Sequence, residues 1–189
     1  MVEQSRSFPH SSVPCRPFRH ILDCRLSPCQ RYRYQLQVAL SPEWIDAPTL
    51  TVILKNPSTA DAQRGDPTTG KVEAWARHHG FAVVTYLNLF ALRSPYPKTI
   101  NSVNYAEAVG DANDQTIQDE LGTAQMVVIA WGNPNGIEAA RYQQRIAEVT
   151  QLLKPLQNTV SSVGPCTLLG QPRHGLQWRK EMAIKRLGD

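Results

Sequence analysis

The sequence predicts an α/β fold: a three-layer α/β/α domain with a central, mainly parallel sheet of about four strands. Three apolar runs, "TLTVIL", "FAVVTYLN" and "AQMVVIAW", alternate along the chain with segments of helical period. Buried strands that alternate with helices are typical of a parallel sheet covered on both faces. The apolar content of 41% and the charged content of 19% are those of an ordinary folded chain,.

The 189 residues divide into one domain and two tails,. Residues 1–30 contain Pro9, Pro14, Pro17 and Pro28 without a helical or strand period, which predicts an irregular, basic, cysteine-containing arm,. Residues 31–176 are expected to form the single α/β domain. Residues 177–189 form a basic C-terminal tail.

The first elements of the domain follow from period and capping signals. "RYRYQLQVAL" alternates polar and apolar residues, as in a half-buried strand near a sheet edge, and "TLTVIL" is a more fully buried strand,. "GDPTTGKVEAWARHHG" then predicts a helix, with Asp66 as N-cap, Pro67 at the first helical position and Gly80 as the stop,.

The strand and helix alternation continues to the end of the domain. "FAVVTYLN" predicts a strand, residues 104–121 are helical in places, and "AQMVVIAW" is a third buried strand,. A helix over residues 137–154 follows, with Ile146, Val149 and Leu153 at helical spacing,. "NTVSSVG" is a last short strand.

Each predicted strand ends in a polar loop. The loops read "NPSTAD", "NLFALRSPYP", "WGNPNG" and "GQPRHG". Ligands of open parallel sheets bind beyond the carboxyl ends of the strands, because loops and helix N-termini gather there. We therefore expect these loops to meet at one edge of the sheet and to form the functional site.

The loop after the first buried strand supplies several candidates. Asn56 can orient a water or bind a base edge, or can instead form an Asx-turn that ends the strand. Ser58 and Thr59 can donate to a phosphate or cap the turn. Asp61 and Asp66 can act as general base or magnesium ligand, although Asp66 before Pro67 is also explained as a helix cap.

The other loops add candidates of two kinds. Asn88 can read a nucleobase or bond to backbone, and Arg93 can bind an anion or pair with Asp61 or Asp66. His174 can polarise a leaving group or be a surface histidine. Trp131 is either a stacking platform or a core anchor, and its neighbour Gly132 is also a candidate ligand contact.

Composition and motifs narrow the class of protein. The longest apolar runs are far shorter than the roughly 20 residues of a membrane helix, and no secretory signal pattern is present, so a cytoplasmic protein is expected,. The Gly-rich dinucleotide and triphosphate motifs are absent,. Cys15, Cys24 and Cys29 are too loosely spaced to predict a zinc or cluster site, so no metal or cofactor is expected,.

Five motifs carry a resemblance to a known family. "LKNPSTADAQRGDPTTG", "LNLFALRSPYP", "GDAND", "IAWGNPNG" and "GQPRHGL" closely resemble, in order and spacing, bacterial domain-of-unknown-function family sixteen-forty-three. The resemblance covers residues 31–176. One departure is that the last family motif usually reads His-Pro-Leu, where this chain has His174, Gly175 and Leu176.

A more distant resemblance implies an activity. "VILKNPST", "YLNLFALRSPYP" and "PRHGL" are similar to segments of mismatch-specific uracil- and thymine-DNA glycosylases, which implies a uracil-DNA-glycosylase-like fold. The resemblance implies that Asn56 positions the attacking water, that Asn88 recognises the flipped base and that His174 stabilises the leaving base or enters the duplex. Ser58 and Gly175 depart from the glycine and the proline of those motifs.

Three hypotheses follow. The first is a metal-independent N-glycosidase-like enzyme acting on a base–sugar bond in DNA or a modified nucleotide. The second is a non-catalytic module that binds nucleic acid or a nucleotide in the same pocket. The third, a metal-dependent phosphohydrolase built on Asp61 and Asp66, lacks further carboxylates or histidines to complete a metal cage. The net charge of +4 and the basic ends, including Arg16, Arg19 and Arg25, are compatible with a polyanionic partner,.

Overall fold

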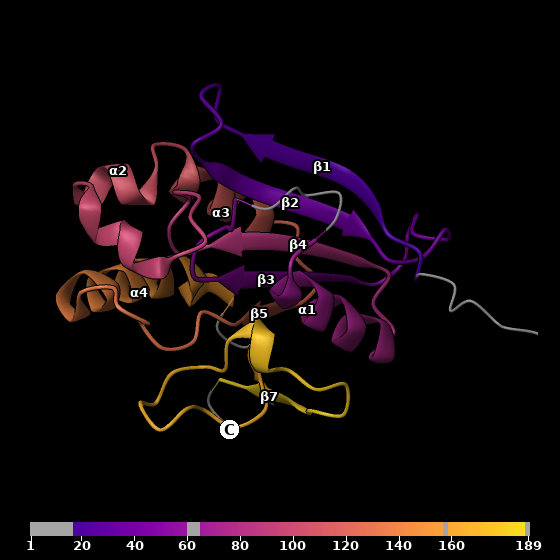
Figure 1. The fold of residues 1–189 in the computed structure, drawn as a ribbon. Helices are drawn as coiled ribbons and strands as arrows, with labels where there is room; N and C mark the ends of the chain where they lie inside the picture. Colours follow the sequence, from indigo (N-terminus) through magenta and orange to yellow (C-terminus); the bar gives the residue numbers. More distant parts are fainter. Residues whose placement is uncertain (1–16, 60–64, 157–158, 188–189) are drawn as a thin grey trace, which may run out of the picture.

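The computed structural model describes residues 17–59, 65–156 and 159–187. In these residues seven strands form one sheet (Figure 1). The strands are β1 (His20–Leu26), β2 (Arg33–Ala39), β3 (Thr49–Leu54), β4 (Val83–Asn88), β5 (Val127–Ile129), β6 (Val160–Val163) and β7 (Ile184–Arg186).

The sheet has a parallel centre and antiparallel edges. Its order is β1-β2-β4-β3-β5-β6-β7, and the strands β4, β3, β5 and β6 are parallel to one another. β2 pairs antiparallel with both β1 and β4, and β7 pairs antiparallel with β6. The prediction of about four strands is therefore too low, although the parallel part does contain four.

Two edge strands lie in segments for which no strand was predicted. β1 falls within residues 1–30, which were expected to be irregular, and β7 falls in the basic C-terminal tail. β1 has only three half-buried residues and no buried one, and β7 is three residues long. Strands with so little burial have no clear hydrophobic period, so pairing with β2 and β6 decides their structure.

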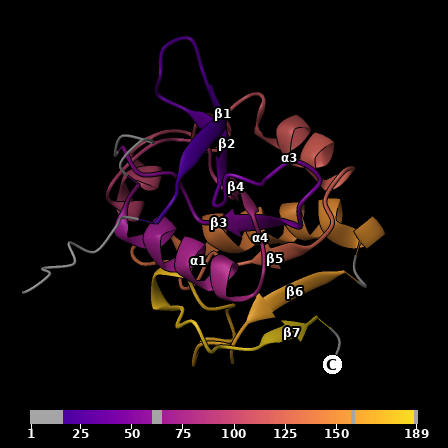
Figure 2. The same cartoon turned by 90° about the vertical axis from the view of Figure 1, so that its right-hand side faces the viewer.

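Helices cover both faces of the sheet. They are α1 (Pro67–His78), α2 (Tyr105–Val109), α3 (Asn113–Leu121) and α4 (Ala139–Leu153), with single turns η1 (Pro97–Ser102), η2 (Lys154–Leu156) and η3 (Gly175–Gln177). Seen along the strands in Figure 2, α1 lies on one side of the sheet and α3 and α4 lie on the other.

Each face has its own hydrophobic core. Val52 and Leu54 point from β3 toward α1 and pack with Trp75 and Trp178, whereas Ile53 points to the opposite side, toward Tyr142 of α4. This alternation follows from the period of two along a strand. The two cores, one on each face of the sheet, confirm the three-layer arrangement predicted from the alternating elements.

The N-terminus of α1 agrees with its predicted cap. The Asp66 side chain accepts from Thr69 N at 2.9 Å, the Thr69 hydroxyl oxygen accepts from Asp66 N, and Pro67 occupies the first helical position. Gly80 follows the helix with a φ of +81°. This capping satisfies backbone donors that would otherwise lack partners at the helix start.

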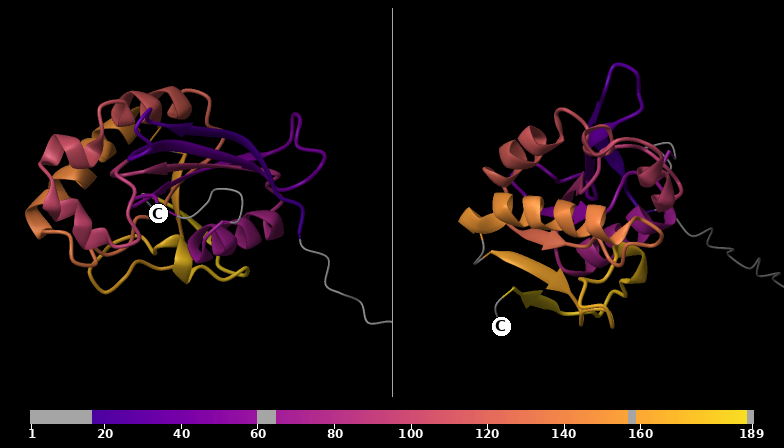
Figure 3. Two further views of the ribbon diagram at one scale, coloured as in Figure 1. Left: turned by 45° about the horizontal axis from the view of Figure 1, so that its top comes forward. Right: turned by 90° about the vertical axis from the view of Figure 1, so that its left-hand side faces the viewer.

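The direction of the chain connections reverses between β3 and β5. β3 is flanked by β4 on one side and β5 on the other. The connection after β3 leads to α1 on one face, and the connection after β5 leads to α4 on the opposite face. In open α/β sheets such a reversal leaves space at the carboxyl ends of the strands. The right-hand view of Figure 3 looks onto this edge.

Candidate functional site

Asn56 ties two loops together at the edge where the parallel strands end. Its Nδ2 donates to Ser94 O at 2.9 Å and to Pro57 O at 3.3 Å. Ser94 N in turn donates to Pro57 O at 2.9 Å. The amide orientation is therefore fixed by two carbonyl oxygens, and no described residue donates to its Oδ1. Asn56 both stabilises the loop and presents an acceptor.

Ser58 and Asp66 form a second link, between the loop after β3 and helix α1. The Ser58 hydroxyl donates to Asp66 Oδ2 at 2.7 Å, while Asp66 Oδ1 accepts from Thr69 N. Both carboxylate oxygens of Asp66 are thus engaged in the helix cap. This arrangement favours the structural role for Asp66 over that of a general base or magnesium ligand.

Thr59 and Arg93 lie together farther along the same edge. Arg93 Nη2 donates to Thr59 O at 3.1 Å and Arg93 Nη1 donates to Gln30 O at 3.0 Å. Both residues border a recess of about 290 Å³ that Arg31 also lines. Among the described residues Arg93 bonds to backbone oxygens and forms no ion pair with Asp66.

Asn88 ends β4 and is almost completely buried. Its exposed fraction is 1%, and its Oδ1 has no hydrogen-bond partner in the described part of the chain. Its backbone carbonyl accepts from Asn113 Nδ2 at 3.1 Å. A buried acceptor without a donor is unfavourable by about 1–3 kcal/mol, so Asn88 Oδ1 is a group that a ligand or water can satisfy.

Lys55 is the most unusual residue of this edge. It follows β3 directly, its exposed fraction is 3%, and burial lowers its pKa to about 8. Its Nζ makes no hydrogen bond or ion pair within residues 17–59, 65–156 and 159–187, and lies 5.9 Å from the centre of the Tyr142 ring. Burial of an ammonium group without a counter-ion is costly, so such lysines are candidates for function.

His174 is held as a neutral imidazole near Lys55. Burial is the main cause that lowers its pKa, to about 4, and the positive charge of Lys55 lowers it further, while Asp66 opposes the shift. Leu176 N donates to His174 Nδ1 at 3.3 Å, so the ring proton of the neutral form is on Nε2,. The imidazole therefore offers an N–H donor at Nε2 over the physiological pH range.

Gly132 and Tyr142 position the His174 loop. A Cβ on Gly132 would lie 2.7 Å from His174 Cβ, and Gly132 has a φ of +68°, so a side chain is excluded on both grounds,. The buried Tyr142 hydroxyl donates to Gly132 O at 2.7 Å and lies 3.2 Å from Trp131 O. α4 thereby fixes the turn after β5 against which His174 packs.

A small polar recess borders His174 on its other side. Its volume is about 110 Å³, and its lining includes the amide residues Asn133 and Asn135 as well as Leu176. Thr167 donates to Asn133 Oδ1 at 2.7 Å, which orients that amide. Amides beside an imidazole can recognise the edge of a heterocycle. Neither Asn56 nor Asn88 lines this recess.

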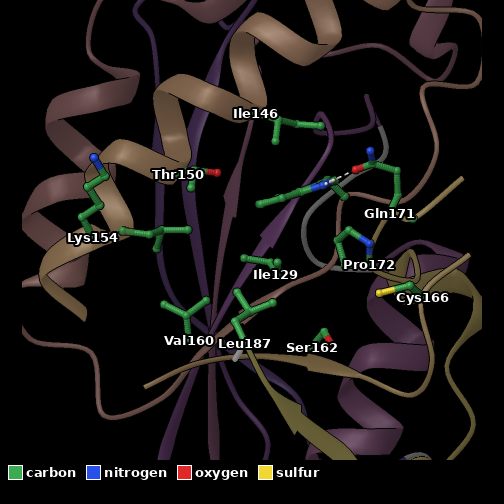
Figure 4. A pocket seen from close by; sticks show the side chains of 13 residues that line it. Ile129, Ile146, Thr150, Lys154, Val160, Ser162, Cys166, Gln171, Pro172 and Leu187 are labelled. Carbon is green, nitrogen blue, oxygen red and sulfur yellow. Dashed lines mark hydrogen bonds between the residues drawn. The ribbon is translucent and has the colours of Figure 1, made fainter. Parts of the chain in front are cut away.

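Trp131 lies in the core on the α4 side. Its exposed fraction is 3%, and its Nε1 donates to Gln171 Oε1 at 3.1 Å. The indole borders an apolar cavity of about 560 Å³ between α4 and β6, with Ile129, Ile146 and Leu187 in its lining (Figure 4). Trp131 is thus a core residue at this cavity and is separate from the polar recess that His174 lines.

A second buried cation faces the α1 side of the edge. Arg33, the first residue of β2, has an exposed fraction of 5%, and its guanidinium group forms no hydrogen bond or ion pair with a described residue. Burial is the largest effect on its pKa and lowers it, and the charge of Asp66 partly compensates. Two cations, Arg33 and Lys55, are therefore buried without a paired carboxylate in the described chain.

The remaining expectations concern acids, cysteines and the basic arm. Asp61, Cys15 and Arg16 lie outside the described residues. Within them, Cys24, Cys29 and Cys166 are free thiols, and no group of three metal-binding side chains occurs. Arg19 pairs with Glu73 at 2.9 Å and Arg25 donates to Thr116 at 3.3 Å, so both engage the domain itself. No described helix is long and apolar enough to cross a membrane.

The comparisons with known proteins place the chain in a family. Residues 33–176 match the family described as "Protein of unknown function (DUF1643)", which is more than half of the 189 residues. The chain belongs to the DUF1643 family. Searches of the curated proteins and of the solved structures found no match. The DUF1643 region begins at Arg33 and contains β2 to β6 and the His174 loop, whereas β1 and β7 lie outside it.

Several residues of the site were not among the sequence candidates. They are Lys55 and Asn133, which lie within motifs, Arg33 in the first predicted strand and Tyr142 in the helix predicted over residues 137–154. Lys55 is a charged residue between an apolar strand and a polar loop, and a charge at that position could have indicated a functional side chain. The burial of Arg33 and Tyr142 follows only from packing between elements distant in sequence.

Proposed function

We propose that this DUF1643 protein is an N-glycosidase-like enzyme that hydrolyses a base–sugar bond in DNA or in a modified nucleotide. The observation that carries the proposal is the neutral His174, with its proton on Nε2, beside the buried ammonium group of Lys55. When a base departs from its sugar, negative charge develops on the base. A fixed N–H donor and a nearby cation in a buried site stabilise such charge.

The water side of the reaction is assigned to Asn56. Its Nδ2 is held by the carbonyls of Ser94 and Pro57, so its Oδ1 has a defined direction. An acceptor oriented in this way can hold a water molecule by one of its protons and direct its lone pair at the anomeric carbon. No metal is assigned a role in this scheme.

Ligand recognition is assigned to groups without partners. Asn88 Oδ1 is buried and accepts no hydrogen bond in the described structure, so a donor on the base would satisfy it,. The buried guanidinium group of Arg33 would be neutralised by a phosphate of the ligand,. Both features support a ligand that combines a heterocycle with an anionic group.

A second candidate is a non-catalytic module that binds the same ligand. It is favoured by the bonds of the Asn56 amide, which also explain Asn56 as a loop anchor. It is further favoured by the cavities, because Asn56 and Asn88 line neither the recess at His174 nor the recess at Arg93. The two candidates differ in one observable, the release of a free base.

The experiment measures base release from labelled oligonucleotides and from the corresponding nucleoside monophosphates, in the presence of EDTA. The substrates contain uracil, hypoxanthine, mismatched thymine or a bulky modified base. Asn56→Ala is expected to reduce release at least about 100-fold, the scale of one oriented catalytic group, while retaining affinity. Asn104→Ala, which removes the side-chain cap of α2 and touches none of the proposed site residues, is the matched control and is expected to retain activity.

The outcomes separate the candidates. Asn88→Ala is expected to change the choice among bases, because a site group left unpaired discriminates strongly between ligands. Tight binding by the wild-type protein without release of any base would favour the binding module. Absence of both binding and release on all these substrates would contradict both candidates.

A further inference from the structure

We infer that Lys55 Nζ acts as an amine nucleophile that forms an imine with the aldehyde of a ring-opened deoxyribose, the sugar left after the base has departed. This inference rests on the proposed function, because that function generates the sugar. It adds a covalent step for Lys55, which in the proposed hydrolysis acts only through its positive charge.

Lys55 differs from the other lysines of the chain in its surroundings. The five others, Lys71, Lys98, Lys154, Lys180 and Lys185, are all exposed, whereas Lys55 is buried at the end of β3. Strand β3 occupies the centre of the parallel region, beside the point between β3 and β5 where the direction of the chain connections reverses. The fold therefore places one lysine at the position where open α/β sheets bind their ligands.

The Lys55 amine is not completely sealed, although the residue has an exposed fraction of only 3%. Nζ has no hydrogen-bond partner among the described residues, and it is not one of the unpartnered polar atoms that lie wholly out of contact with solvent. The tip of the side chain consequently reaches water. No carboxylate within the described residues pairs with Lys55. Its Nζ lies 5.9 Å from the centre of the Tyr142 ring, and its positive charge lowers the pKa of His174.

This environment favours the neutral amine. Desolvation of the ammonium lowers the pKa of Lys55 to about 8, so roughly a quarter of the molecules carry a free lone pair near pH 7.5,. Lysines activated by an apolar pocket are established nucleophiles toward carbonyl groups. A structural cation–π contact alone would not require access to solvent.

The proposed reaction requires only the Lys55 amine, the sugar aldehyde and water. The Nζ lone pair attacks the C1′ aldehyde carbon, and the resulting carbinolamine loses its oxygen as water to give a protonated imine. The His174 Nε2–H can donate a hydrogen bond to the departing oxygen. Loss of a C2′ proton to solvent then expels the 3′-phosphate as its C–O bond breaks, and water hydrolyses the imine to restore Lys55.

The test supplies the aldehyde directly. An oligonucleotide with one preformed abasic site, and separately 2-deoxyribose 5-phosphate, is incubated with the full chain and sodium cyanoborohydride, which reduces an imine to a stable amine. The adduct is measured by gel shift and mass spectrometry, and the modified peptide is identified. We expect one main adduct on Lys55.

Variants identify the responsible residue. Lys55→Arg, which retains the charge, and Lys55→Met, which retains the stem, are each expected to reduce the adduct at least tenfold. Lys154→Gln and Lys71→Gln remove exposed lysines and are expected to leave the adduct unchanged. Retention of the far-ultraviolet circular dichroism spectrum in at least one Lys55 variant validates the comparison.

The inference and the proposed function fail separately. Base release without an adduct on either aldehyde would overturn the role of Lys55 and leave the N-glycosidase proposal in place. An adduct on Lys55 without base release from any substrate would support the amine and count against the N-glycosidase. An adduct that persists in both Lys55 variants, or maps to exposed amines, would overturn the inference.

Discussion

At the scale of single residues, the site contains two basic groups, Lys55 and His174. A positive charge on one of them disfavours a positive charge on the other. Lys55 is buried and His174 is half-buried, and the charge of Lys55 adds to the desolvation that keeps His174 neutral. Of the two, only Lys55 carries a positive charge at neutral pH. His174 is therefore a neutral hydrogen-bond donor and Lys55 a cation, whereas two charged groups would repel each other.

The first prediction concerns the protonation of His174. Its folded pKa of about 4 lies below the ordinary value near 6.5, so the unfolded chain binds the extra proton first as pH falls,. The stabilising effect of the neutral ring is complete above about pH 6.5 and is lost progressively toward pH 4, at a cost of about 3 kcal/mol. Urea unfolding between pH 4 and 7 measures this loss.

The control for this prediction is His174→Asn, whose side-chain oxygen can replace Nδ1 as the acceptor of Leu176 N. Its unfolding free energy should depend less on pH in that window. An NMR titration of the His174 ring with a midpoint near 6.5 would contradict the prediction.

At the scale of elements, the His174 loop is positioned by contact between η3 and α1. A Cβ on Gly175 would lie 2.6 Å from Val72 Cγ2 and 3.3 Å from Thr68 Cγ2. The backbone of η3 therefore touches the side chains of α1 directly. This contact explains why glycine, which has no Cβ, fits after His174 in this chain.

The second prediction follows from this close packing. Gly175→Ala should lower the unfolding free energy by about 1–3 kcal/mol, because the added methyl group overpacks a filled contact. The loss should be smaller in a Val72→Ala background, where the opposing methyl groups are removed. Chemical denaturation of the four chains in this double-mutant cycle gives the coupling free energy.

Gly70→Ala is the matched control on the same helix. Nothing lies within 4 Å of a Cβ at Gly70, so alanine should stabilise α1 by about 0.5–1 kcal/mol through its higher helix propensity,. Additive effects of Gly175→Ala and Val72→Ala would show that η3 does not dock on α1 in this way.

At the scale of the whole molecule, the segments around β1 and β7, which are distant from each other in sequence, both pack against the central domain. Arg19, next to β1, pairs with Glu73 on α1, and Trp75 Nε1 donates to Met182 O near β7 at 2.8 Å. The segments outside the matched family region are therefore joined to the α1 layer. Among the basic N-terminal residues that the structure describes, Arg19 and Arg25 therefore bond to the domain itself.

The third prediction tests this role of Arg19. Glu73 is buried, with an exposed fraction of 4%, and its other cationic neighbour is Arg77 at 4.0 Å. Arg19→Met should lower the unfolding free energy by about 2 kcal/mol or more, because a buried carboxylate loses its close partner. Thermal and urea unfolding measure the effect, with Arg186→Met on exposed β7 as the control.

The same variants also test polymer binding. If Arg19 is structural, Arg19→Met should leave the salt dependence of DNA affinity unchanged, whereas a phosphate contact would reduce the slope by about one. A reduced slope together with unchanged stability would contradict the structural role.

The sequence by itself determined the parallel centre of this protein and the edge where its polar loops meet. The apolar periods of β3, β4 and β5 and the cap at Asp66 and Pro67 are local signals, and local physics is sufficient to interpret them. Tertiary structure decided the edge strands β1 and β7, because their residues gain order from pairing rather than from a hydrophobic period.

Tertiary structure also decided the charges of the site. Burial of Lys55 and Arg33, and the neutral state of His174, arise where β3, β5, α1 and α4 converge, and no local pattern encodes the number of carboxylates that reach such a point. The sequence indicated that polar residues gather there. Only the packing of elements from across the chain determined which cations remain without a paired carboxylate among the described residues, because desolvation depends on everything that surrounds a group.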